Sequence, residues 1–98
     1  MTSETEIPPV PVLVAAHTWN LDDTLAQVIA QGVRLLRERQ VAFPPTLTPD
    51  EWDAVLDEMA EGFEAWHQTR HVRRNDEALP KLNRSLDLLR EWFPHLWD

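Results

Sequence analysis

The sequence predicts an all-α protein: a three-helix bundle with an extended, proline-rich N-terminal arm. Apolar residues recur at helical spacing in three separate segments of the chain. Most of the eight prolines lie before these segments or at their ends, where proline is tolerated. A length of 98 residues suits one small domain. We therefore expect residues 1–18 to form the arm and residues 19–98 to form a single helical domain.

Composition excludes several classes of function. The chain has no cysteine, so disulfides, cysteine-bound metals and thiol nucleophiles are ruled out. Seventeen acidic residues against nine basic ones give a net charge of −8, which argues against direct binding to nucleic acid or to an anionic membrane. Two glycines provide no phosphate-binding loop. We therefore expect a protein that is not an enzyme and uses no cofactor.

The N-terminal arm does not have the pattern of a secretory signal. Glu4 and Glu6 stand where such a signal has basic residues, and the apolar run 12–16 is too short to cross a bilayer. We expect a cytoplasmic protein without a membrane segment. The arm should be extended because proline fixes φ and removes a backbone donor at Pro8, Pro9 and Pro11.

The first helix is predicted over residues 21–39. Acidic residues near its start and arginines in its last turns suit the helix dipole. Gly32, on the apolar side, suggests the close approach of another helix. The side expected to face the core consists of Leu21, Leu25, Val28, Ile29, Gly32 and Leu36.

The second helix has the clearest start in the chain. Thr48 and Glu51 have the spacing of a capping box, and Pro49 occupies the first helical position. Helical periodicity then continues to about residue 74. The apolar stripe of this helix consists of Trp52, Leu56, Met59, Phe63 and Trp66.

The third helix is predicted from about residue 76 or Pro80 to Phe93, because Pro94 ends it. Its main stripe consists of Leu82, Leu86, Leu89, Phe93 and Leu96. The stripes of the three helices should meet in one core. Its central members are expected to be Met59, Phe63, Val28 and Leu89.

A second apolar flank adjoins the main stripe of the third helix. Leu88 and Trp92 lie on this flank, which makes the apolar arc wider than one core requires. Tryptophan often anchors protein interfaces. We therefore predict that Leu88, Trp92 and Trp97, with the arm residues around Val12, form an apolar patch for a partner or for self-association. The alternative is that the N-terminal arm folds across this flank.

A row of acidic residues runs along the second helix, opposite its apolar stripe. Like charges four residues apart repel each other, so the row is either a solvated face or a docking surface for a basic partner. We expect it to be exposed and to contribute to any contact with a macromolecule. Its members, at 100° per residue, are Asp50, Asp53, Asp57, Glu61 and Glu64.

Two patterns suggest chemistry but are better explained by helix structure. Glu64, His67 and His71 are spaced for metal binding from one helix face, but a two-metal site needs a second such set and the sequence has none. Residues 19–25 resemble the first motif of haloacid-dehalogenase-type phosphatases, but Asn20 replaces the nucleophilic aspartate. We predict no metal site and no catalytic residue.

Several short pieces occur in order along the chain. They are Leu21-Asp22-x-Thr24-Leu25-Ala26, Arg37-Glu38 before a proline-containing loop, Leu47-Thr48-x-x-Glu51-Trp52-x-x-x-Leu56-Asp57-x-Met59, Phe63-Glu64, Leu86-Asp87-Leu88 and Phe93-x-x-Leu96-Trp97. This ordered set resembles a group of small uncharacterised acidic proteins encoded by tailed bacteriophages, which often have a longer insert after the second helix. The resemblance implies a phage or prophage origin and no particular activity.

Together these observations predict a non-enzymatic, phage-encoded accessory protein that binds a macromolecular partner in the host cytoplasm. One such role is inhibition of host machinery or host defence through the acidic helix face. The alternative is a small structural or assembly component of the virion, whose apolar surface is buried between copies. A protein partner or self-association, including a homodimer, fits these roles, and direct nucleic-acid binding does not.

Overall fold

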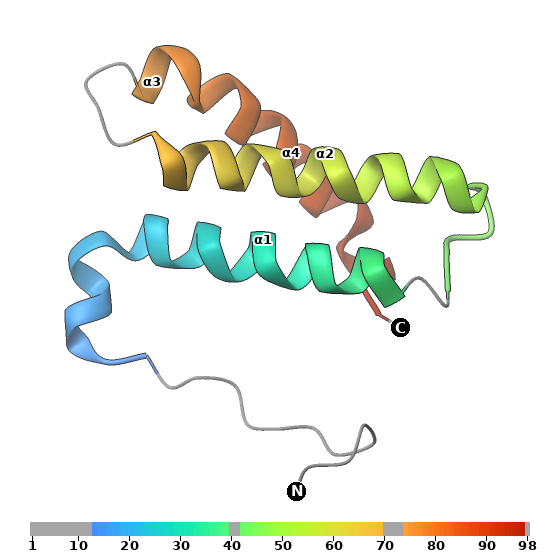
Figure 1. Cartoon of the computed structure of the whole chain (residues 1–98), viewed down its shortest axis with the longest axis horizontal. Helices are drawn as coiled ribbons and strands as arrows, with labels where there is room; N and C mark the ends of the chain where they lie inside the picture. Colours follow the sequence, from blue (N-terminus) through green and yellow to red (C-terminus); the bar gives the residue numbers. More distant parts are fainter. Residues whose placement is uncertain (1–12, 40–41, 70–73, 98) are drawn as a thin grey trace, which may run out of the picture.

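The computed structural model of the chain is a three-helix bundle, as the sequence predicts (Figure 1). It describes residues 13–39, 42–69 and 74–97, and within these ranges it contains no strand. The elements, with η for a 3-10 helix, are η1 (Ala15–Asn20), α1 (Leu21–Arg39), α2 (Pro49–Gln68), α3 (Arg74–Glu77), α4 (Leu79–Trp92) and η2 (Phe93–His95).

The predicted N-terminal arm gives way to helix before residue 18. Residues 1–12 lie outside the described part of the chain, and Val14 is extended. The helix η1 then begins at Ala15, where local hydrogen bonds close it. The His17 N–H donates to the Val14 carbonyl at 2.9 Å, and the Thr18 hydroxyl donates to the Ala15 carbonyl at 2.7 Å. Helical structure thus starts four residues before the predicted domain boundary.

The helix boundaries follow the local sequence signals. α1 covers the predicted residues. The predicted capping box starts α2: Thr48 Oγ1 accepts from the Glu51 N–H at 3.2 Å, and the Glu51 carboxylate accepts from the Thr48 N–H at 2.8 Å. α2 ends at Gln68, earlier than the periodicity predicts. The third predicted helix is divided into the short α3 and the longer α4.

The core is built on α2, which packs against both α1 and α4. α1 runs antiparallel beside α2, α4 crosses behind α2 in the view of Figure 1, and α1 and α4 scarcely touch each other. The predicted stripe of α2 is confirmed up to Phe63, and Trp66 is half-buried beside it. The buried apolar cluster consists of Ala26, Ala30, Val33, Trp52, Leu56, Met59, Ala60, Phe63 and Leu88.

The core-facing sides of α1 and α4 differ from the prediction. Two alanines and Val33 bring α1 against α2, whereas Val28, expected in the core, is 55% exposed. Leu89 of α4 is half-buried at the edge of the core. Small side chains let α1 approach the large residues of α2 closely. Ile29 and Leu36 are half-buried at the edge of this contact, and the remaining bulky apolar residues of α1 are exposed.

A glycine does allow a close helix crossing, but at Gly62 and not at the predicted Gly32. A Cβ added at Gly62 would lie under 3.0 Å from both Ser85 Oγ and the Lys81 carbonyl oxygen, so α2 and α4 meet almost backbone to backbone. Ser85 is fully buried, and its hydroxyl donates to the Glu58 carbonyl at 2.9 Å. A Cβ at Gly32 would meet nothing within 4 Å.

Candidate functional site

The acidic stripe of α2 faces α1, and two arginines of α1 bind it. Arg34 holds Glu64 with two hydrogen bonds, from Nε to Oε2 at 3.0 Å and from Nη2 to Oε1 at 2.7 Å. Its Nη1 donates to Asp57 Oδ1 at 2.9 Å. Arg37 Nε donates to the same Asp57 oxygen at 3.1 Å, and its Nη2 lies 3.7 Å from Asp53 Oδ2. These five side chains form what we call the interhelical ion-pair network.

Within the network, the pair of Arg34 and Glu64 favours the charged form of both side chains. The hydrogen bond from Arg34 lowers the pKa of the Glu64 carboxyl below its ordinary value, although partial burial opposes this effect. The same hydrogen bond raises the pKa of the Arg34 guanidinium. These two side chains keep about a third of their surface exposed, so the network adds modest stability and mainly fixes how α1 lies on α2.

The prediction of an exposed acidic stripe is therefore wrong for three of its five members. Asp53, Asp57 and Glu64 are only partly exposed and bind arginines, whereas Asp50 and Glu61 are exposed. The reason is that α1 places two arginines, one turn apart, against the same arc of α2. Most of the carboxylate row thus joins two helices of this chain.

A second set of polar contacts joins the first turn of α1 to the last turns of α2. Trp66 Nε1 donates to Asp22 Oδ2 at 2.9 Å. His67 Nδ1 lies 2.8 Å from Asp23 Oδ1. Asp23 is buried, so this contact supplies a hydrogen bond to a carboxylate that has lost its water. The sequence indicated only that these aspartates suit a helix start, because no local spacing links residues 44 positions apart.

The residues considered as metal ligands have other contacts in the fold. Glu64 binds Arg34, and His67 contacts Asp23, while His71 lies outside the described residues. Over the described ranges, no three or more His, Asp or Glu side chains are grouped as a metal site would require. The described part of the chain therefore offers no arrangement on which to base metal chemistry.

The apolar patch predicted from Leu88, Trp92 and Trp97 is divided by the structure. Leu88 is 3% exposed and belongs to the core. Trp92 is half-buried and packs edge-on against Trp52, with ring centroids 5.7 Å apart. Trp97 is exposed in the tail after η2. The prediction is wrong for the first two residues because α4 turns this flank toward α2, which leaves Leu86 and Phe93 of its main stripe exposed.

Part of the apolar stripes expected in the core on α1 and α4 forms an exposed surface instead, while Ile29 and Leu36 of the α1 stripe are half-buried against the core. On α1, intervals of four, three, four and three residues separate Leu21, Leu25, Val28, Gly32 and Leu35. Such heptad spacing aligns residues along one side of a helix and typically marks the seam between two packed helices. All five are exposed, Leu35 to 63%. We call this line the α1 seam.

A similar line runs along α4. Intervals of four, three and four residues separate Leu82, Leu86, Leu89 and Phe93, which we call the α4 seam. Leu82 and Leu89 are half-buried against the core, and Phe93 is 67% exposed. Sequence reasoning placed these residues in the core and did not single out Leu35 on α1. The heptad intervals themselves were the signal that would have identified that residue.

The two seams border an apolar trough, which we define as two adjoining hollows that share Ile29. The larger, of about 500 Å³, lies between the second half of α1 and the end of α4 with its tail. The smaller, of about 250 Å³, lies between the first half of α1 and the start of α4, where α2 contributes Phe63 and Trp66. The lining has one charged residue at each end, Asp22 in the smaller hollow and Arg39 in the larger.

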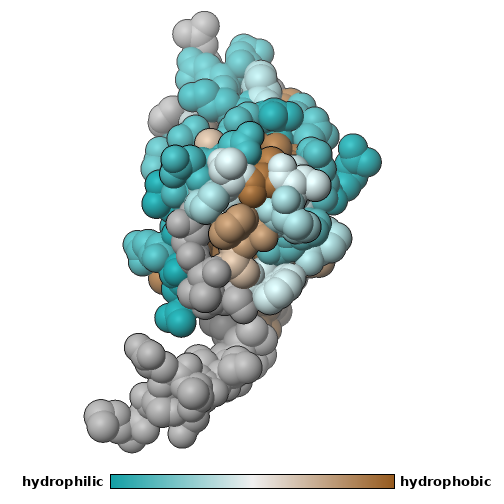
Figure 2. Space-filling view, turned by 90° about the vertical axis from the view of Figure 1, so that its right-hand side faces the viewer, coloured by the Kyte–Doolittle hydropathy of each residue, from teal (hydrophilic) through white to brown (hydrophobic). Residues whose placement is uncertain are grey.

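Hydrophobic side chains also reach the surface at the end of the molecule where α1 finishes. Figure 2 views the side that lies to the right in Figure 1, and it shows a hydrophobic band between two hydrophilic margins. Apolar surface of this kind, with a polar border, is typical of sites that bind another protein. Because its lining is apolar apart from Asp22 and Arg39, the trough is the strongest candidate for such a site.

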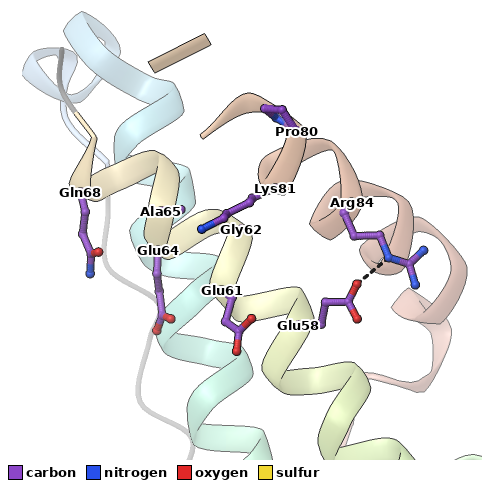
Figure 3. Close-up of a pocket in the computed structure, with 9 residues that line it drawn as sticks. All are labelled: Glu58, Glu61, Gly62, Glu64, Ala65, Gln68, Pro80, Lys81 and Arg84. Atoms are coloured by element: carbon purple, nitrogen blue, oxygen red, sulfur yellow. Dashed lines mark hydrogen bonds and ion pairs between the residues drawn. The ribbon is translucent and has the colours of Figure 1, made fainter. Parts of the chain in front are cut away.

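A second groove, between α2 and α4, is mainly charged. Its lining includes three glutamates of α2 and two basic residues of α4, and Figure 3 shows Glu58 pointing toward Arg84 while Glu61 and Glu64 point away from α4. Arg84 Nε donates to Glu58 Oε1 at 2.6 Å, and Glu64 is bound by Arg34 on the side of α1. The groove thus neutralises much of its own charge and contains no nucleophile paired with a base.

No described helix is both long enough and apolar enough to cross a membrane. Comparison with protein-family models, with curated proteins and with solved structures finds no match for this chain.

Proposed function

We propose that this chain is a non-enzymatic protein that acts by binding another protein chain, and that the apolar trough is its binding surface. The observation that carries this proposal is the pair of heptad seams, which expose large apolar side chains along two helices. Leaving such side chains in water costs roughly 25 cal/mol for each Å² that a partner would cover. A covered trough removes that cost.

The trough, and not the acidic stripe, is the surface we assign to the partner. Three of the five stripe carboxylates are bound within the chain by Arg34 and Arg37, so the stripe presents less charge than its sequence suggests. Asp50 and Glu61 remain as exposed charges, and they can speed an encounter with a basic partner without providing much affinity.

We place the protein among phage-encoded accessory proteins that work in the host cytoplasm, on the strength of the sequence resemblance described above. Between the two roles expected from the sequence, the exposed seams favour a structural or assembly component over an inhibitor that acts through charge. An assembly component buries apolar surface between chains, whereas a charge-based inhibitor needs an open acidic face.

Affinity capture with matched variants tests the proposal. Wild-type protein, a trough variant (Leu35→Glu with Phe93→Glu) and a stripe variant (Asp50→Asn with Glu61→Gln) are each used to capture proteins from cells that express the chain. All four substituted side chains are exposed, so the variants should fold. We expect the trough variant alone to lose its bound protein. Loss with the stripe variant and retention with the trough variant would refute the assignment.

A further inference from the structure

We propose that the chain covering the trough is a second copy of this protein, with the two α1 seams packed antiparallel across a two-fold axis. This inference rests on the proposed function, because it names the occupant of the same surface. The structure supplies three arguments for a second copy: the placement of the two seams, the symmetry of the α1 seam and the charges at the ends of the trough.

The first argument is that the surface is apolar on both sides of the trough. α1 and α4 each carry a seam, and they scarcely touch each other. A second copy of the chain would place its own α1 and α4 against these seams. Four seams would then form one helical core, and each seam would meet a surface of the same kind, as an isologous dimer requires.

The second argument is that the inner part of the α1 seam reads the same in both directions. Its four inner members, Leu25, Val28, Gly32 and Leu35, are spaced symmetrically about residue 30. An antiparallel copy therefore sets Leu25 opposite the partner's Leu35 and Val28 opposite the partner's Gly32. Gly32 has open space where a Cβ would stand, which lets the second helix come close at the centre of the contact. A large residue thus meets a small one on either side of the axis.

The third argument is charge. In the antiparallel arrangement centred on residue 30, Arg39 at one end of the trough stands opposite the partner's Leu21, one residue along the helix from the partner's Asp22. Asp22 already accepts a hydrogen bond from Trp66, but a carboxylate has several acceptor sites. The dipoles of two antiparallel helices also oppose each other favourably. A parallel arrangement would instead bring like charges together at both ends.

The mass of the protein in solution tests the self-association. Light scattering across a concentration series is expected to show a dimer for the wild type. Leu35→Glu should weaken it by at least about 30-fold, because a charge is buried twice in each symmetric dimer. The control is Gln31→Glu, on an exposed polar side of the same helix, which should leave the dimer intact.

Three outcomes would overturn the inference: a wild type that stays monomeric throughout the series, a dimer that survives Leu35→Glu, or a dimer that Gln31→Glu disrupts equally. A monomeric wild type that still captures a different protein through the trough would refute the second copy and leave the proposed function standing. A monomeric wild type that also captures no protein through the trough would refute both the second copy and the proposed function.

Cross-linking tests the antiparallel orientation, and the absence of native cysteine makes it direct. Chains with Leu25→Cys and chains with Leu35→Cys are mixed and treated with a short bismaleimide. We expect the two kinds of chain to be linked to each other. In this arrangement a Leu25→Cys chain should not link to its own kind, because equivalent positions are offset by about 15 Å along the helices. Preferential linkage of Leu25→Cys to itself would show a parallel pair and overturn the orientation.

Discussion

Replacing Gly62 by alanine tests the closest contact in the fold. A Cβ at this position would stand under 3.0 Å from Ser85 Oγ and from the Lys81 carbonyl oxygen, where ordinary contact requires 3.4–4 Å. Ser85 is fully buried and the Lys81 oxygen belongs to the backbone of α4, so a flexible side chain cannot absorb the clash. The whole of α4 must move away from α2, and the Ser85 hydrogen bond to Glu58 must lengthen or break.

The expected magnitude follows from two opposing effects. Overpacking of a core contact costs about 1–3 kcal/mol and sometimes more. Alanine in place of a glycine inside a helix stabilises that helix by up to about 1 kcal/mol. Because backbone must shift here, the overpacking cost should be about 3 kcal/mol, the upper end of its range. After the gain from alanine is subtracted, we expect the free energy of unfolding to fall by about 2 kcal/mol.

A matched control uses the only other glycine in the chain. Gly32→Ala introduces the same Cβ into α1, where nothing lies within 4 Å, so it should stabilise the protein by about 0.5–1 kcal/mol. Urea unfolding measures both variants, each in a Leu35→Glu background that removes any contribution from self-association. Equal effects of the two substitutions, or a stabilised Gly62→Ala, would refute the close crossing of α2 and α4.

The remaining predictions concern the cap, the ion pairs and the core. Thr48→Ala should cost about 0.5–2 kcal/mol in urea unfolding, and an unchanged midpoint would show that the cap does not hold α2. The lowered pKa of Glu64 means that its pair with Arg34 stabilises the fold above the unfolded pKa, and that this stability is lost as pH falls through the folded pKa. Arg34→Gln should therefore flatten the acid side of a plot of stability against pH, and an unaltered plot would contradict the pairing. In the monomeric background, Met59→Ala should cost about 2–5 kcal/mol and Val28→Ala less than about 0.5 kcal/mol, whereas equal costs would place Val28 in the core after all.

Features of the fold that depend on neighbouring residues were predictable from the sequence. The capping box at Thr48 needs only residues within one helical turn, so its spacing was sufficient to locate the start of α2. The stripe of α2 was also predictable, because α2 has a single apolar side and that side must be buried. Both the number of long helices and their approximate limits follow from the same local patterns.

Features that depend on which sides of two helices meet were not predictable. α4 has two apolar sides, and the sequence favoured the more apolar one, with Leu86 and Phe93. The fold buries the other side, because the small Ser85 there lets α4 reach Gly62. Likewise, the stripe carboxylates appeared solvated because the arginine that binds Glu64 lies 30 positions away. In the proposed dimer the exposed leucines of these stripes are interface residues, so their sequence pattern indicates burial in the assembly.

The dependence of stability on protein concentration tests the central claim most directly. Burial of the α1 seam against a second copy couples folding to association. The urea midpoint of the wild type should therefore rise when the protein concentration is increased 100-fold. A 100-fold excess over Kd adds about 2.7 kcal/mol to the free energy of unfolding. The midpoint of Leu35→Glu should stay constant and match that of the wild type at the lowest concentration. A wild-type midpoint that does not change over this range would contradict the claim that another copy covers the trough.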